Sequence, residues 1–138
     1  MGLKMNKKEL LKRKGGVFPK GQLSIDEVIS DVKQNPNVGD AGAIACFIGQ
    51  TRRTSQDGRS TIKLEIEAYD EQADAILDRI ACEIIQMEGI IDARIYHATG
   101  TFEIGEDLVF VIIAGAHRTE LFSALHKAVE RYKTEAPV

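Results

Sequence analysis

The sequence is short of cysteine and of long apolar runs, and each shortage excludes a class of protein. Cys46 and Cys82 are the two cysteines among 138 residues, too few for a disulfide framework and without the spacing of metal ligands. Both lie in segments predicted to be buried, where thiols are inert. The longest apolar run, Leu108 to Ala116, is far shorter than the roughly 20 residues that a membrane helix needs.

Several motifs that would identify a catalytic class are also missing. The three histidines, His97, His117 and His126, have a spacing that matches no metal motif. There is no Walker loop, dinucleotide fingerprint, serine nucleophile elbow or paired-histidine zinc motif. The basic N-terminus has no apolar segment behind it, so no secretory signal is predicted. We therefore expect a cytoplasmic protein without a metal site.

The remaining composition is that of one globular domain. Hydrophobic residues make up 43% of the chain and charged residues 28%, close to the averages for globular proteins. These values exclude overall disorder and collagen-like or coiled-coil architecture. A chain of this length has room for one domain and hardly for two.

The basic residues are concentrated at the N-terminus. Eighteen basic and 21 acidic side chains give a formal net charge of −3. Residues 1–14 carry six basic side chains and one acid, a local charge of +5, which leaves −8 for the rest. A basic arm can bind nucleic acid or an acidic partner, or it can be a solvated terminus. We expect a flexible arm over residues 1–16 and one domain over residues 17–138, whose acidic charge argues against nucleic-acid binding.

Local patterns predict the first half of the domain. The glycine-rich stretch from Gly15 to Gly21 is typical of a loop. Ser24-Ile25-Asp26-Glu27 has the pattern of a capping box, so a short helix is expected to run to about Gln34. Ala43 to Gly49 is an apolar run that suits a buried strand, and the alternation from Ile62 to Tyr69 predicts a strand with one wet face.

The pattern of the second half predicts a helix, two strands and a final helix. Asp70 is expected to cap a helix, Ile90 to His97 to form a strand, and Gly100 to Gly105 a turn or bulge. Asp107 to Ala116 is predicted to be a central strand. Thr119 is expected to cap the last helix, whose inward-facing residues are Leu121, Phe122, Leu125, Val129 and Tyr132. The fold class is therefore α+β, with a mixed or mostly antiparallel sheet and three main helices.

Three places could carry chemistry. Gln50, Thr51 and Arg52 follow the first strand, where a guanidinium can hold an anion or simply keep a surface loop soluble. His117-Arg118 stands at the start of the last helix, a natural place for a phosphate or carboxylate, although His117 can also be an ordinary turn residue. Lys133 borders the apolar stripe of that helix. If the Lys133 side chain is half-buried, its pKa is lowered, and the amine suits general-base or covalent catalysis. If it is not, Lys133 is a surface lysine whose aliphatic stem lies along the apolar stripe while its charge stays in water.

The order of these pieces resembles the large, catalytic subunit family of molybdopterin synthase over roughly residues 24–138. The matching motifs are Gly42-Ala43 with Phe47-Ile48-Gly49 and Arg52, Leu64-Glu65-Ile66-Glu67-Ala68-Tyr69, His97 and Gly100 ahead of Gly105-Glu106, Ala116-His117-Arg118, and Tyr132-Lys133-Thr134-Glu135-Ala136-Pro137. The chain differs from the family pattern at Gln50, where a basic residue is usual, and at Ala98, where arginine is common. The family pattern also continues, past the position of Val138, with an aromatic residue and a second catalytic lysine.

The resemblance implies a sulfurtransferase of molybdenum cofactor biosynthesis. Such an enzyme adds two sulfurs to cyclic pyranopterin monophosphate, and the sulfur arrives as a thiocarboxylate on the C-terminal Gly-Gly of a small ubiquitin-like carrier subunit. The fold implied is an α/β hammerhead with an added antiparallel subdomain. Two large subunits form the centre of a heterotetramer, and no metal or organic cofactor takes part. Gln50, Thr51, Arg52, His117 and Arg118 match substrate-binding positions.

Lys133 matches a catalytic lysine of the family. Arg118 and Lys133 are fifteen residues apart on one predicted helix, roughly 22 Å, so we expect a composite site in which His117-Arg118 of one subunit approaches Lys133 of its mate. Two other functions remain open. One is a non-catalytic homologue that docks the carrier, and the other is a phosphate- or nucleotide-sensing module that uses the His117-Arg118 helix end alone.

Overall fold

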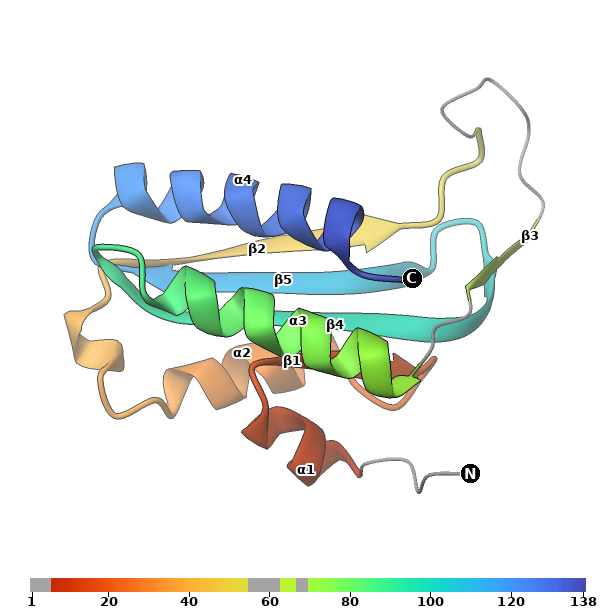
Figure 1. Ribbon diagram of the computed structural model, residues 1–138, viewed down its shortest axis with the longest axis horizontal. Helices are drawn as coiled ribbons and strands as arrows, with labels where there is room; N and C mark the ends of the chain where they lie inside the picture. Colours follow the sequence, from red (N-terminus) through yellow and green to blue (C-terminus); the bar gives the residue numbers. More distant parts are fainter. Residues whose placement is uncertain (1–5, 55–62, 67–69) are drawn as a thin grey trace.

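A mixed β-sheet forms the centre of the computed structural model, which describes residues 6–54, 63–66 and 70–138 (Figure 1). The strands stand in the order β1 (Gly15–Pro19), β4 (Ile90–Glu103), β5 (Asp107–Gly115) and β2 (Ala43–Gln50). β1 is parallel to β4, and the other neighbouring strands are antiparallel. β3 (Lys63–Ile66) pairs with the far end of β4. The predicted α+β class with a mixed sheet is confirmed.

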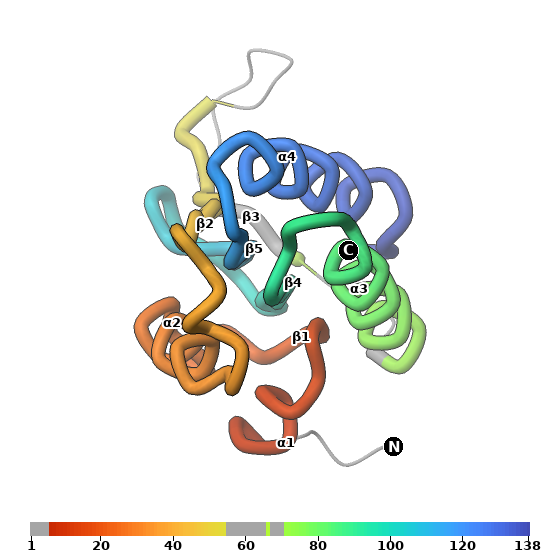
Figure 2. Tube along the Cα trace, turned by 90° about the vertical axis from the view of Figure 1, so that its left-hand side faces the viewer, coloured from red at the N-terminus to blue at the C-terminus, as the bar shows by residue number. Residues whose placement is uncertain are grey.

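The helices are divided between the two faces of the sheet (Figure 2). α3 (Asp70–Ile85) and α4 (Arg118–Glu135) cover one face, and α1 (Lys7–Lys12) and α2 (Ile25–Lys33) lie on the other. A short 3₁₀ turn, η1 (Val38–Asp40), leads from α2 towards β2. Each face has its own apolar core, one containing Leu77, Ile80 and Leu121, and the other Val28 and Phe110.

Two local predictions are confirmed in detail. Ser24 accepts a hydrogen bond from the backbone N–H of Glu27, and the Glu27 side chain accepts one from Ser24, so α2 begins with a capping box. β5 is central, and its residues from Val109 to Gly115 are buried. Its continuous apolar pattern follows from having one helix layer on each face.

β2 and β4 differ from the predictions. β2 is the edge strand of the sheet, so it is only partly covered, and Cys46 within it is exposed. Cys82 on α3 is exposed as well. β4 continues through Gly100 to Glu103, because β3 provides a partner for its distal part, and the turn is limited to Ile104 and Gly105. An apolar run alone does not distinguish an edge strand from a central one.

α4 also differs from its prediction at the N-terminal end. His117, and not Thr119, is the N-cap residue. Leu121 and Tyr132 face inward as expected, but Phe122 is 60% exposed. Ala124 and Ala128 take the buried positions instead, because small side chains allow the helix to approach the sheet closely.

The N-terminal segment is folded onto the domain from residue 6 onward, which corrects the expected flexible arm and the expected glycine-rich loop. α1 contributes Leu10, which is 1% exposed, and Gly15–Pro19 forms β1 in the sheet. Both glycines of β1 lie against α3, since a Cβ on Gly15 would come within 2.5 Å of the Leu77 backbone. The basic side chains between residues 7 and 14 therefore belong to a segment that packs onto the domain. Residues 1–5 lie outside the described part of the chain.

Candidate functional site

His117 and Arg118 stand where β5 leads into α4. His117 is the N-cap residue in an extended conformation, and its side chain makes no capping hydrogen bond. Arg118 is the first residue of the helix, and both side chains are exposed. The N–H groups of a first helical turn have no partners within the helix and lie at the positive end of its dipole. Together with the two side chains they can hold an anion.

Gly42 brings the start of β2 against this junction. Its N–H donates to the carbonyl of Gly115 over 2.9 Å, and a Cβ at Gly42 would lie 2.4 Å from the carbonyl oxygen of Ala116. A larger residue would therefore push β2 away from the start of α4. The close approach places the open strand β2 directly beside His117 and Arg118.

Arg52 follows the other end of β2, on a loop that is tied to the turn between β4 and β5. The backbone N–H and the hydroxyl of Thr51 both donate to the carbonyl of Glu106, over 3.0 and 3.3 Å. Thr51 is 3% exposed, so its side chain anchors the loop. Gln50 lies on the surface and its amide approaches Asp107 at 3.4 Å. Arg52 is exposed and has no ion-pair partner among the described residues.

Lys133 lies in the last turn of α4, and the end of this helix lies at the same end of the molecule as the end of β2, which Arg52 follows (Figure 1). The residue is exposed rather than half-buried, so the surface interpretation holds for the single chain. Its neighbour Arg131 is bound to Glu83 and Glu135 at 2.7 Å each, and Arg79 also pairs with Glu135. Lys133 has no such partner in the described part of the chain.

Within one chain, the predicted site residues thus lie in two separate groups. Arg52 and Lys133 are at the end of β2, whereas His117 and Arg118 are at its beginning, and α4 runs between the two groups. Fifteen residues of helix correspond to roughly 22 Å. One small ligand cannot bridge that distance.

The two groups are joined by an open surface that the sequence did not predict. The Glu83 and Arg79 contacts place Arg131 and Glu135 on the flank of α4 that faces α3. Helical geometry puts Arg118, Phe122 and Lys133 on the opposite flank, above the edge strand. Phe122 on this flank is 60% exposed, whereas Ile48 of β2, 39% exposed, lies on the other face of the strand, because Ala45 and Phe47 pack on the α4 side. An open strand edge beside exposed apolar side chains is a typical interaction surface.

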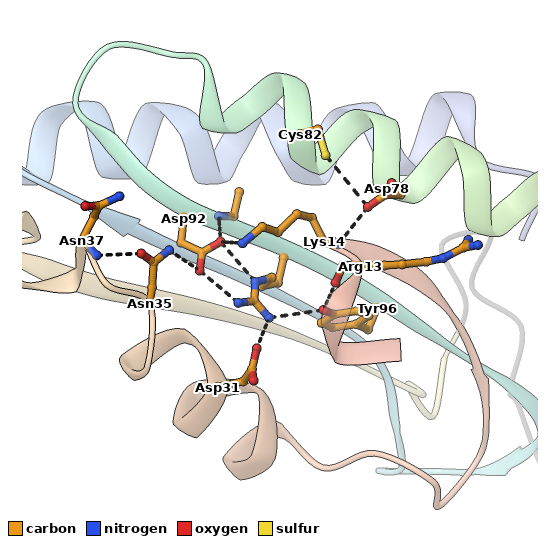
Figure 3. Close-up of polar contacts among 11 residues, drawn as sticks. Arg13, Lys14, Asp31, Asn35, Asn37, Asp78, Cys82, Asp92 and Tyr96 are labelled. Carbon is orange, nitrogen blue, oxygen red and sulfur yellow. Dashed lines mark hydrogen bonds and ion pairs between the residues drawn. The ribbon is translucent and has the colours of Figure 1, made fainter. Parts of the chain in front are cut away.

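A buried ionic cluster on the other face of the sheet was also missed (Figure 3). Asp92, 1% exposed, accepts two bonds of 3.1 Å from the Arg94 guanidinium and one of 3.0 Å from the Lys14 ammonium. Burial opposes ionisation of Asp92, but the bonds from Arg94, Asn35 and Lys14 outweigh it and lower its pKa. The cluster connects β4 to the N-terminal segment and lies away from the candidate site, so its role is structural.

Comparisons with known proteins identify the family. The family model described as MoaE protein matches residues 19–135. A molybdopterin synthase catalytic subunit from Pyrococcus abyssi is 36% identical over 115 residues, which cover 83% of this chain and 74% of that protein. The catalytic subunit from Bacillus subtilis is 33% identical over 119 residues, 86% of this chain and 73% of its own length. The chain belongs to the MoaE family.

Other MoaE-like proteins extend the comparison. A probable molybdopterin synthase from Haloferax volcanii is 33% identical over 117 residues, and these span 84% of this chain but 45% of that protein. The crystal structure of molybdopterin synthase from Staphylococcus aureus superposes with a TM-score of 0.74 at 26% identity, covering 91% of this chain and 86% of that one. A complex of subunits 1 and 2 of molybdopterin-converting factor from Helicobacter pylori, at 17% identity and a TM-score of 0.66, shows the same fold.

Membership of the MoaE family confirms the resemblance and the expectation of a sulfurtransferase of molybdenum cofactor biosynthesis. The matched range includes every candidate residue from Gln50 to Lys133. The matched range begins at Pro19, the last residue of β1, so α1 and the rest of β1 precede the range. Among the described helices, none has the length and apolar character that crossing a membrane requires. Within the same residues, no three His, Cys, Asp or Glu side chains form a metal-binding group.

Proposed function

We propose that this MoaE-family chain is the catalytic subunit of a molybdopterin synthase. It adds two sulfurs to cyclic pyranopterin monophosphate and so builds the dithiolene of molybdopterin. The sulfur donor is the C-terminal thiocarboxylate of a small ubiquitin-like carrier. The observation that carries the proposal is the pattern of exposed cations around the open β2 edge, with Arg118 at one end and Arg52 and Lys133 at the other.

Two copies of the chain complete the site. β2 has an open edge, and antiparallel pairing with β2 of a second copy would satisfy its backbone groups and cover the exposed apolar side chains beside it. In such a pairing the start of each strand lies beside the end of the other. His117 and Arg118 of one copy then approach Arg52 and Lys133 of the partner subunit, and each homodimer has two composite sites.

Clustered cations suit this reaction for two reasons. The pterin phosphate and the carrier's thiocarboxylate are both anions, so a basic pocket reduces their mutual repulsion. Once the sulfur is bonded to the pterin, water adds to the acyl carbon, the C–S bond breaks, the sulfur stays on the pterin and the carrier leaves as a carboxylate. The addition develops negative charge on the acyl oxygen, and nearby cationic donors stabilise that charge more in the transition state than in the ground state. Guanidinium groups bind the phosphate with forked donors, and Lys133 is placed to serve the reacting acyl group.

The partner that we assign is the carrier subunit, docked on the homodimer to form a heterotetramer. In Helicobacter pylori a protein of the same fold occurs in a complex of subunits 1 and 2 of molybdopterin-converting factor. An anionic, flexible C-terminal tail can enter a narrow basic site that a folded domain cannot. Gln50 and Thr51 support the loop of Arg52 in this arrangement, since the Thr51 hydroxyl is already used by Glu106.

Reconstitution tests the proposal. The purified chain is mixed with thiocarboxylated carrier and the pterin precursor, and dithiolene product is measured. The wild-type chain should form product and Lys133→Ala should abolish it, whereas Lys127→Ala, which removes an exposed lysine from the same helix, should retain full activity. Carrier binding without any turnover by the wild-type chain would instead select the non-catalytic homologue. Nucleotide binding without carrier binding would select the sensing module.

A further inference from the structure

A transverse row of residues crosses the sheet beneath the C-terminal part of α4. His97 of β4 pairs with Val17 of β1 on one side and with Val109 of β5 on the other, and Val109 pairs with Gly49 of β2. The row therefore ends at Gly49, on the open edge of the sheet. A Cβ at Gly49 would lie 2.5 Å from a methyl group of Val109, so this position has no room for a side chain.

Tyr132 of α4 lies over this row. Its ring centroid is 6.0 Å from that of His97, and its hydroxyl is 3.9 Å from the place that a Cβ of Gly49 would occupy. Because Gly49 has no side chain, the Tyr132 hydroxyl lies close to the backbone of the edge strand. Gln50, Thr51 and Arg52 follow Gly49 directly.

The Tyr132 hydroxyl has no hydrogen-bond partner among the described residues, although the side chain is 5% exposed. Burial raises the pKa of Tyr132 to about 12, so the group is a protonated donor at neutral pH. Glu120 Oε2 is the unpaired side-chain atom that is fully buried among the described residues, so the Tyr132 oxygen still reaches solvent. A ligand at this end of the sheet can therefore contact the hydroxyl.

Tyr96 shows the opposite arrangement on the other face of the sheet. Its hydroxyl donates to the carbonyl of Arg13 and accepts from the Arg94 guanidinium at 3.4 Å (Figure 3). Tyr96 is therefore satisfied within the chain, whereas Tyr132 presents a free donor at the end of the molecule that holds Arg52 and Lys133. A hydroxyl without a partner inside the chain is available to donate to a ligand.

We propose that the Tyr132 hydroxyl donates a hydrogen bond to the acyl oxygen of the carrier's thiocarboxylate, which makes Tyr132 a substrate-contacting residue next to Lys133. This inference rests on the proposed function. The acyl oxygen is the better match because a neutral donor within a mostly buried side chain suits an oxygen that enters a confined space. The phosphate carries more charge and suits the exposed guanidinium groups at the rim.

The test compares Tyr132→Phe with Tyr96→Phe in the reconstituted complex, because both substitutions remove one hydroxyl from a buried tyrosine. Tyr132→Phe should leave the melting temperature close to that of the wild type and lower kcat/KM for the carrier about tenfold, the effect of one hydrogen bond. Tyr96→Phe should lower the melting temperature and leave kcat/KM per folded molecule unchanged.

Wild-type kinetics for Tyr132→Phe would overturn the inference, whatever its stability. An increase in KM for the pterin alone would overturn the assignment to the acyl oxygen. Failure of the proposed function is recognised separately, since the wild-type complex would then form no product. In that case calorimetric binding of thiocarboxylated carrier still tests Tyr132: about tenfold weaker binding to Tyr132→Phe supports the contact, and equal binding refutes it.

Discussion

Arg118 and Lys133 lie on the same flank of α4 but at opposite ends, fifteen residues and roughly 22 Å apart. Both face the side on which the edge strand β2 is open. A straight helix cannot bring them together, so a shared site requires two chains. The open edge of the sheet is therefore a testable part of the proposed composite site.

Complementation between two inactive variants follows from the composite site. Arg118→Ala and Lys133→Ala chains should each be inactive as homodimers. When the two are unfolded together and refolded at equal amounts, half of the dimers are mixed, and each mixed dimer has one intact site and one doubly altered site. The mixture should recover about a quarter of the wild-type activity. Product formation in the reconstitution assay measures this.

The control is the pair Arg52→Ala and Lys133→Ala, which both alter the same end of β2. Their mixed dimers have two damaged sites and should recover no activity. Equal recovery by the two mixtures, or no recovery by the first, would show that Arg118 and Lys133 do not act in one composite site.

The ion pair between Lys14 and Asp92 should stabilise the N-terminal segment on the sheet. Asp92 is buried and Lys14 supplies one of its cationic partners at 3.0 Å. Lys14→Met should lower the free energy of unfolding by about 1–2 kcal/mol, because Arg94 and Asn35 continue to compensate the carboxylate. Urea denaturation at pH 7 measures the change.

Lys12→Met is the matched control, since Lys12 is an exposed lysine in the same segment. It should shift the unfolding free energy by less than about 0.5 kcal/mol. If both variants unfold at the same urea concentration as the wild type, the buried ionic cluster does not secure this segment.

His97 should make stability depend on pH in the mildly acidic range. Burial lowers the pKa of His97, and the carbonyl of Ala98 opposes this only in part. The unfolded state, with a histidine pKa of about 6.5, therefore binds a proton more readily than the folded state. The stabilising contribution is complete above pH about 6.5 and is lost as the pH falls through the lower, folded-state pKa.

Urea midpoints measured between pH 7.5 and 5 check this expectation. His97→Gln should reduce the loss of stability over that range, whereas His126→Gln, which alters an exposed histidine on α4, should keep the wild-type slope. Asp92, whose pKa is lowered, contributes in a separate and more acidic range, below its ordinary value of 3.8. An unchanged slope for His97→Gln would contradict the prediction.

Local signals were enough to predict α2, the central strand β5, the α+β class and the placement of His117-Arg118 at a strand-to-helix junction. These features depend on contacts between residues near in sequence, such as the Ser24–Glu27 capping box, or on uninterrupted apolar character. The family itself was also readable from its motifs, and the comparisons confirm it.

Long-range packing decided the rest. The apolar pattern of β2 could not reveal that no strand covers its outer edge within the chain, and the composition of residues 6–16 could not reveal that Leu10 is buried and Gly15–Pro19 joins the sheet. The separation of Arg52 from Arg118 likewise depends on the antiparallel course of β2, β5 and α4. Edge position, burial and the partner of a hydroxyl such as that of Tyr132 are set by segments distant in sequence, so no local pattern can encode them.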